Sequence, residues 1–239
     1  MPGPRPTNVE AVLDYVDAQG ASGRATFPVP VVDMIPKTRW DIFFPAVLKA
    51  QCRPKRADVV MVLDSSSSMT GEARPGITKL DEAVKSARTF LDAMQLPDDR
   101  AAIVTFDSGA RVNQSLTGSR PALEFALAGI SAGRGTRIDL GLETGLGEVL
   151  GPNHAPGNTP VMIVLTDGRP AGGSEAATVA NADLSQRLGV ELFMIGLGAD
   201  ADQLLLLLLA GDPRNFYFAP TTDALAAIYA SIAGDVLCR

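Results

Sequence analysis

One feature constrains the fold more than any other, a run of apolar residues with no polar interruption. Val59–Leu63 is apolar at every position. A strand with one face in water alternates apolar and polar residues, so a continuous run predicts a parallel strand that is covered on both faces. Two further buried strands are predicted at Val161–Thr166 and Glu191–Leu197.

Amphipathic segments separate these strands. From Leu80 to Met94 the apolar residues recur at the three- and four-residue spacing of one helix face, and Pro97 follows the expected end. The same reasoning predicts further helices at Arg120–Leu127, Ile138–Leu150, Glu175–Leu188, Asp202–Ala210 and Asp223–Val236.

A hairpin interrupts the alternation. Arg100–Phe106 and Ala110–Leu116 are predicted strands, and the turn Asp107–Gly109 separates them, so one strand should be antiparallel at the sheet edge. A short last strand is expected at Asn215–Phe218. The order predicts an α/β fold with a doubly wound, mostly parallel six-stranded sheet, one antiparallel edge strand and helices on both faces.

Residues 1–50 differ from the rest in being rich in proline, and they are interpreted as an N-terminal extension or arm. Short β-like runs occur at Thr26–Val32 and Trp40–Phe44. Because proline cannot donate a ladder hydrogen bond, strands here should be edge strands or arms against the main domain. Residues 51–239 are predicted to form that main domain.

Composition excludes some classes of function. The chain has 239 residues, 46% of them hydrophobic, and a net charge of −6, which disfavours nucleic acid as a partner. No apolar stretch reaches the roughly 18 residues that span a bilayer, so membrane insertion by this chain is not expected. Met1–Thr7 lacks the charged-then-apolar layout of a signal peptide, and the chain as given is expected to be soluble.

Three oxygen-bearing motifs fall at the predicted ligand edge of the sheet. Asp64–Ser68 has the pattern D-x-S-x-S after the first buried strand, Thr166–Gly168 reads T-D-G after another, and Gly133–Thr136 is a glycine-flanked loop before a helix. Asp and Ser also favour helix caps and turns, so one motif alone would mean little. Together they form an all-oxygen set that suits Mg²⁺ or Mn²⁺, with Ca²⁺ as an alternative, and not zinc or copper.

This combination resembles the metal-ion-dependent adhesion site of von Willebrand factor type A domains. The similarity runs from about Asp58 to Val236. In that family the two serines and the threonine contact the metal directly, while the aspartates often act through water. The resemblance assigns these roles to Ser66, Ser68, Thr136, Asp64 and Asp167.

Charge accounting indicates what such a site would do. If the direct ligands are mostly neutral hydroxyls, the cation keeps much of its positive charge and an open coordination position. A Glu or Asp carboxylate of a protein partner can fill that position. The prediction is therefore a metal-dependent binding module for adhesion or interaction and not an enzyme.

Two alternative classes of function stand beside this prediction. A metal-dependent hydrolase is disfavoured because the sequence lacks a G-x-S-x-G motif and a P-loop lysine, and its one histidine, His154, reads as a spacer in the loop Gly151–Gly157. Gly196-x-Gly198 lacks the rest of a dinucleotide motif and reads as a turn. The alternative binding role is an intracellular assembly module, like those of chelatases or ATPase partners.

The two cysteines bear on the compartment. In some extracellular relatives a disulfide joins the ends of the domain, so the resemblance implies a Cys52–Cys238 bond and an extracellular or cell-surface location. Two unrelated thiols and a cytoplasmic location are the alternative. Some relatives slide their last helix when ligand binds. A bond at Cys238 would restrain that helix and favour a constitutively ready site.

Two further groups of side chains have a structural interpretation as well as a functional one. The segment Leu204–Leu209 consists of leucine alone, so it is either covered by a neighbouring segment such as residues 1–50 or used for self-association. Lys79, Asp107 and Arg137 lie near the predicted rim, where they are expected to be solvated charges that do not contact a ligand.

Overall fold

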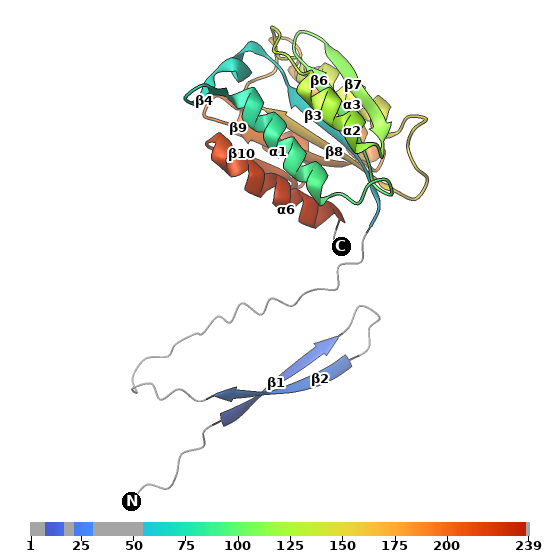
Figure 1. Ribbon diagram of the computed structural model, residues 1–239, viewed down its shortest axis with the longest axis vertical. Coiled ribbons are helices and arrows are strands. Elements are labelled where there is room, and N and C mark those ends of the chain that lie inside the picture. The colour runs from blue at the N-terminus through green and yellow to red at the C-terminus, as the bar shows by residue number, and fades with distance from the viewer. Residues whose placement is uncertain (1–7, 17–21, 31–54, 238–239) are drawn as a thin grey trace, which may run out of the picture. The chain divides into compact units, whose positions relative to one another are not determined.

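The computed structural model describes residues 8–16, 22–30 and 55–237, which are coloured in Figure 1. The chain divides into two compact units, Met1–Leu48 and Lys49–Arg239. Cys52 and Cys238 lie outside the described residues, as does the predicted β-like run Trp40–Phe44.

The N-terminal unit contains an antiparallel hairpin of β1 (Asn8–Val16) and β2 (Ser22–Pro30). β2 includes most of the strand that was expected at Thr26–Val32, whereas β1 was not predicted. Within the described residues this sheet has two strands, so each has a free edge. That arrangement tolerates the prolines of β2, as the missing donors led us to expect.

The second unit is built on a six-stranded sheet in the order β10-β9-β8-β3-β6-β7. Its one antiparallel pair is the β6–β7 hairpin, with β7 at an edge, and the other neighbours are parallel. The predicted sheet is confirmed. The strands are β3 (Ala57–Asp64), β6 (Arg100–Phe106), β7 (Ala110–Thr117), β8 (Thr159–Thr166), β9 (Glu191–Leu197) and β10 (Phe216–Ala219).

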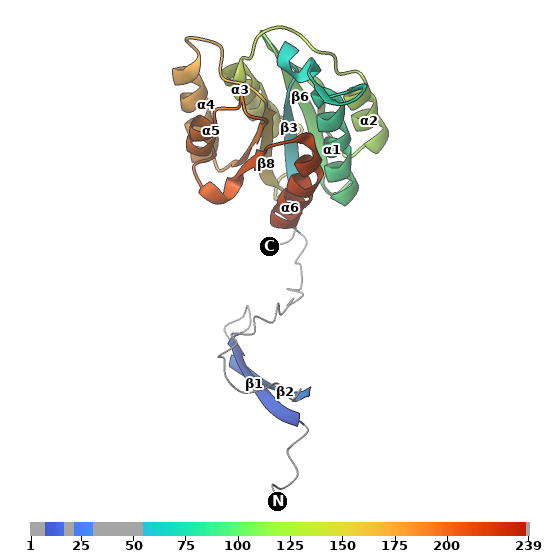
Figure 2. The ribbon, with the colours of Figure 1, turned by 90° about the vertical axis from the view of Figure 1, so that its left-hand side faces the viewer.

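Helices cover both faces of this sheet (Figure 2). One face carries α1 (Lys79–Ala93), α2 (Arg120–Ala128) and α6 (Leu225–Leu237), and the other carries α3 (Ile138–Val149), α4 (Glu175–Arg187) and α5 (Gln203–Ala210). The doubly wound prediction is therefore confirmed. Short elements complete the unit: β4 (Glu72–Arg74), β5 (Ile77–Thr78), and the 3-10 helices η1 (Ser67–Thr70), η2 (Pro213–Asn215) and η3 (Thr222–Ala224).

The central strand β3 explains the apolar run in the sequence. All of its residues are buried. Met61 and Leu63 pack in the core cluster of α1 and α6, while Val60 and Val62 pack in the cluster of α3 and α5. Because side chains alternate between the faces of a sheet, a strand with helices on both sides needs apolar residues at every position.

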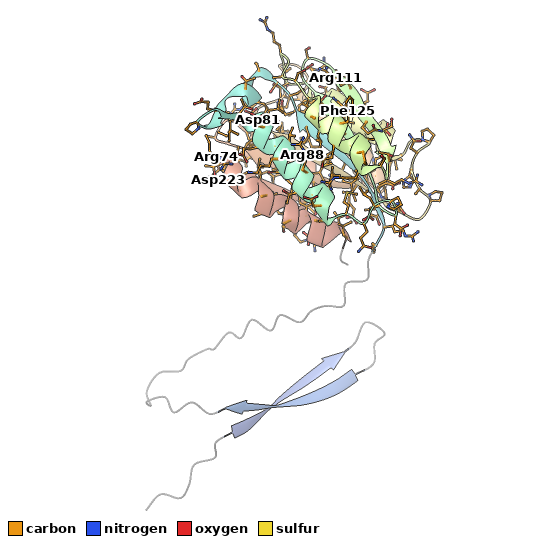
Figure 3. The ribbon with its side chains drawn as sticks, viewed as in Figure 1. Arg74, Asp81, Arg88, Arg111, Phe125 and Asp223 are labelled. Atoms are coloured by element: carbon orange, nitrogen blue, oxygen red, sulfur yellow. The ribbon has the colours of Figure 1, made fainter. Side chains whose placement is uncertain are left out.

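α1 begins with a capping box. The Thr78 hydroxyl accepts a hydrogen bond from the backbone N–H of Asp81, and the Asp81 carboxylate accepts one from the backbone N–H of Thr78. Figure 3 labels Asp81 at this end of α1 and Arg88 further along the helix. These reciprocal bonds satisfy donors that a helix start leaves open, and they fix where the helix begins.

The winding of the sheet reverses beside β3. From β3 the chain moves to β6 and the edge strand β7, and then returns to form β8 on the other side of β3. Leu63 of β3 pairs with Leu165 of β8, so the residues after both positions meet at one edge. In open α/β sheets such a reversal is where ligand sites form.

Candidate metal site

Asp64 ends β3 and is completely buried. Its Oδ1 accepts a hydrogen bond from the backbone N–H of Ser66 at 2.8 Å, and its Oδ2 accepts one from the Thr166 hydroxyl at 2.6 Å. Burial raises the pKa of Asp64 to about 6, the charge of Asp167 adds to the rise, and the hydrogen bonds oppose it. A cation would relieve the cost of this buried charge.

A chain of hydroxyls links the two strand ends. The Ser66 and Ser68 Oγ atoms are 2.9 Å apart, and the Ser68 hydroxyl donates to Oδ1 of Asp167 at 2.6 Å. Ser66 and Asp167 are buried, whereas Ser68 is exposed. The first serine of the loop has a structural role, because the Ser65 hydroxyl donates to the carbonyl of Phe106 at 3.0 Å.

The third motif reaches the same edge. A Cβ built on Gly168 would lie 3.8 Å from the Thr136 hydroxyl oxygen, so Thr136 lies directly beside the residue after Asp167. The Thr136 carbonyl accepts from the N–H of Ala171 at 2.9 Å, and the N–H of Gly133 donates to the carbonyl of Ser65 at 2.7 Å. The structure thus brings all three predicted motifs together.

Two of the three expected rim charges are not solvated. The Lys79 ammonium donates to Oδ2 of Asp167 at 2.7 Å, and its side chain is only 23% exposed. Asp107 is buried, where it accepts from the backbone N–H of Gly109 and from Arg111. The expectation was wrong for both residues, because Lys79 pairs with a carboxylate of another loop and Asp107 is bonded within its own hairpin.

Asp107 and Arg137 support the loop that carries Thr136. A Cβ on Gly133 would overlap the Asp107 carboxylate, so only glycine fits there, and the Asp107 carbonyl accepts from the N–H of Arg137 at 2.8 Å. The half-exposed Arg137 forks onto Asp139 through two hydrogen bonds of 2.8 and 2.7 Å. Sequence reasoning missed this supporting role.

The donor set fits a hard divalent cation. Within residues 55–237 no three His, Cys, Asp or Glu side chains gather as a metal cluster. A cation here would therefore rely on two carboxylates and neutral hydroxyls, as Mg²⁺ and Mn²⁺ do. The Lys79 ammonium already places a positive charge at this edge, 2.7 Å from Oδ2 of Asp167.

His154 is not near these loops. Its Nδ1 lies 2.8 Å from Oδ2 of Asp58, at the opposite end of β3, and Asp58 also accepts from Ala155 and Asn158. The loop histidine therefore helps to attach its loop to the start of β3, and it is more than a spacer. The available signal was the acidic residue at the start of an otherwise apolar strand.

Comparison with known families agrees with this geometry. The sequence profile of the von Willebrand factor type A domain matches residues 58–231. The chain belongs to this family, as the three motifs indicated.

Curated relatives are longer than this chain. Matrilin-2 of Mus musculus is 30% identical over 179 residues, which are 71% of this chain and 18% of matrilin-2. Inter-alpha-trypsin inhibitor heavy chain H6 of Homo sapiens is 28% identical over 206 residues, 77% of this chain and 15% of that protein. The chain thus spans less than a fifth of the length of either relative.

Solved structures share the fold. Proximal thread matrix protein 1 from the mussel byssus, in a form described as having a zinc-occupied metal-ion-dependent adhesion site, has a TM-score of 0.64 and 24% identity over 75% of this chain and 45% of its own. The pilus adhesin SpaC from Lactobacillus rhamnosus GG has a TM-score of 0.65 and 20% identity over 77% of this chain and 31% of its own. Among the described residues, no helix has the length and apolar character to cross a membrane.

Proposed function

We propose that the second unit is a binding module that captures an acidic protein partner through Mg²⁺ or Mn²⁺. Ser66, Ser68 and Thr136 would hold the ion directly, and Asp64 and Asp167 would act largely through water. The observation that supports this most is the hydrogen-bonded chain Ser66–Ser68–Asp167, in which Ser68 meets a carboxylate 99 residues away. These hydrogen-bonded oxygen atoms do not contribute to the packing of the apolar core.

The bound ion would supply a positive charge with a free coordination position. The hydroxyl ligands are neutral and leave that charge largely uncompensated, so a Glu or Asp of the partner completes the coordination. One such contact is weak, and the surface around it must add affinity. The names of the relatives, among them a matrilin and a pilus adhesin, favour binding over catalysis.

Direct metal titration tests the site. Calorimetry with Mg²⁺, Mn²⁺ and Zn²⁺ should give one site in the unaltered protein and at least a tenfold loss of affinity for Ser68→Ala. Ser67→Ala is the matched control, because Ser67 is the exposed neighbour in the same loop. Zinc is included because a structural relative holds it. No binding, or equal losses in both variants, would contradict the assignment.

Partner capture tests the function. The immobilised protein would be exposed to extracellular extracts with Mg²⁺ or with EDTA, and again as Asp64→Ala with Ser66→Ala. Bound proteins should be lost with EDTA and with the double variant, and blocking their carboxylates chemically should have the same effect. A set of partners indifferent to all three changes would count against metal-dependent capture.

We also propose an extracellular or cell-surface location with a Cys52–Cys238 disulfide. The nearest described neighbours support the pairing, because Lys55 and Leu237 both line one cavity of about 240 Å³. A bond there would hold the end of α6 and keep the site constitutively ready. Non-reducing peptide mass spectrometry of the native protein tests this; reduced thiols would favour the intracellular assembly role.

Self-association through the leucine segment is a separate proposal. α5 buries Leu206 and Leu209 but leaves Leu204 81% and Leu208 63% exposed. Sedimentation of the paired variant Leu204→Ser with Leu208→Ser should show a lower mass than the unaltered protein. If both are monomeric, the self-association proposal is wrong.

A further inference from the structure

The proposed metal site contains a lysine that its ligand motifs do not require. We propose that Lys79 is a built-in competitor of the metal, whose ammonium group occupies Asp167 and sets how tightly the site holds its ion. This inference rests on the proposed metal site. It adds a regulatory residue, because metal loading then depends on the cation overcoming a charge that the protein itself supplies.

The path of the Lys79 side chain is defined by two glycines. A Cβ on Gly71 would lie 3.7 Å from Lys79 Cε, and a Cβ on Gly198 would lie 3.9 Å from Lys79 Nζ. The backbone N–H of Lys79 also donates to the carbonyl of Gly71 at 2.9 Å. Segments on both sides of the side chain therefore restrict it and direct the ammonium to Asp167.

The position of Lys79 does not serve its own helix. It is the first residue of α1, where the helix dipole favours negative charge, and Asp81 and Glu82 in the same turn have that sign. A lysine is therefore slightly unfavourable there for the helix itself. Its gain comes from a fully buried carboxylate 88 residues away, which it reaches at 2.7 Å.

Lys85 on the same helix shows the ordinary case. Its side chain is 68% exposed, and its ammonium is 3.7 Å from Glu82. An ammonium this exposed contributes little, because solvent screens it, and the buried Glu82 also pairs with Arg74. Lys79 differs in that its own side chain is only 23% exposed and its ammonium lies 2.7 Å from a carboxylate that no other basic side chain of the described residues is seen to pair with.

Charge accounting gives the direction of the effect. When both are ionised, Asp64 and Asp167 contribute two negative charges, and Lys79 cancels one of them. An arriving divalent cation meets less attraction than it would without the lysine, and the loaded site keeps more positive charge for an anionic partner. At the short separations of one site, removing a unit charge should change metal affinity on the order of tenfold or more.

The test compares metal affinity in variants of the full chain. Lys79→Met removes the charge and keeps an apolar stem of similar length, and Lys79→Arg keeps the charge. Lys85→Met is the matched control, since it removes the same charge from the exposed side of α1. Calorimetry with Mg²⁺ and Mn²⁺ should show about tenfold tighter binding for Lys79→Met and affinities near the unaltered protein for the other two.

Thermal unfolding gives a second readout. In EDTA, Lys79→Met should melt at a lower temperature, because Asp167 loses its partner, and saturating Mg²⁺ should raise its melting temperature more than that of the unaltered protein. Lys79→Gln replaces Lys79→Met if the latter does not fold.

The outcomes separate the two proposals. Equal or weaker metal binding by Lys79→Met, with binding by the unaltered protein intact, overturns the competitor role alone. Equal gains in Lys79→Met and Lys85→Met overturn it too, since net charge would then explain the effect. If neither the unaltered protein nor Lys79→Met binds millimolar Mg²⁺ or Mn²⁺, both the metal site and the competitor role are wrong.

Discussion

The two ends of β3 each bury an aspartate, and the two differ in what surrounds them. Asp58 at the start receives N–H donors from His154, Ala155 and Asn158, at 2.8, 2.6 and 2.7 Å. Asp64 at the other end receives one backbone N–H and one hydroxyl, beside further hydroxyls and a second carboxylate. Both residues are completely buried.

The difference separates a structural carboxylate from one that is proposed to bind a cation. The groups around Asp58 come from one loop, and two of them, the Ala155 N–H and the Asn158 amide, can only donate. They therefore hold that loop against the carboxylate. The hydroxyls near Asp64 can turn and offer lone pairs, so they can serve a cation instead. Donor type, more than burial, distinguishes the two ends.

Removing the Asp58 carboxylate should have the largest effect on stability. Asp58→Ala leaves several donors without their acceptor and should lower the free energy of unfolding by about 3 kcal/mol or more. Urea denaturation measures this, with His154→Ala as a milder variant that loses about 1 kcal/mol. Metal affinity should not change, and a change would mean that the two ends of β3 are coupled.

At the other end of β3, Asp64 should make the stability of the protein depend on pH. Burial raises the pKa of Asp64 from 3.8 to about 6, so between these values the native protein holds a proton that the unfolded chain has lost. Stability of the metal-free protein should therefore fall as pH rises from about 4 to 6, by roughly 2–3 kcal/mol. Asp64→Asn should remove this fall. If the variant keeps the same pH profile, another group is responsible.

Protons should also compete with the metal. Because the proposed ion would need ionised Asp64, Mn²⁺ affinity should weaken about tenfold for each pH unit below the pKa of about 6, and level off above it. Calorimetry from pH 5 to 8 would check this on a protein that stays folded. An affinity independent of pH would mean that Asp64 takes no part in binding.

The smallest expected effect comes from a buried polar atom that lacks the partners found at the two ends of β3. Among the described side chains, the Tyr229 hydroxyl is buried without a hydrogen-bond partner, and its ring packs edge-on against Phe90 with centroids 6.0 Å apart. Tyr229→Phe should raise the free energy of unfolding by about 1 kcal/mol. A loss of stability on thermal or urea unfolding would mean that the hydroxyl has a partner.

Local patterns in the sequence were sufficient for the fold and for the three motifs of the site. Val59–Leu63 predicts a strand that is covered on both faces. The D-x-S-x-S and T-D-G motifs directly follow strands, so the predicted sheet also predicts the edge at which these motifs lie. Lys79 could not be assigned because its partner lies 88 residues away and every exposed lysine looks the same in sequence. The same holds for His154, whose partner lies 96 residues away.

Other misses had a usable signal. Within Asn8–Val16, Val9, Ala11, Leu13 and Tyr15 alternate with more polar neighbours for much of its length, which is the two-residue period of a strand. The β4–β5 hairpin surrounds a proline and Gly76, a common turn pair, but its strands are too short for periodicity. Neither element contributes a ligand to the proposed site.

The cavity shared by Lys55 and Leu237 has a mechanical consequence. Both residues lie at the end of the unit where β3 starts, so the chain enters and leaves it there, away from the Asp64 loops. If the unit were held through Lys55 or Leu237, the loops after Asp64 would face outward. Tension between these two residues would act first on the end of the unit where β3 starts. In the proposed binding module, strain along the polypeptide would therefore reach the metal loops last.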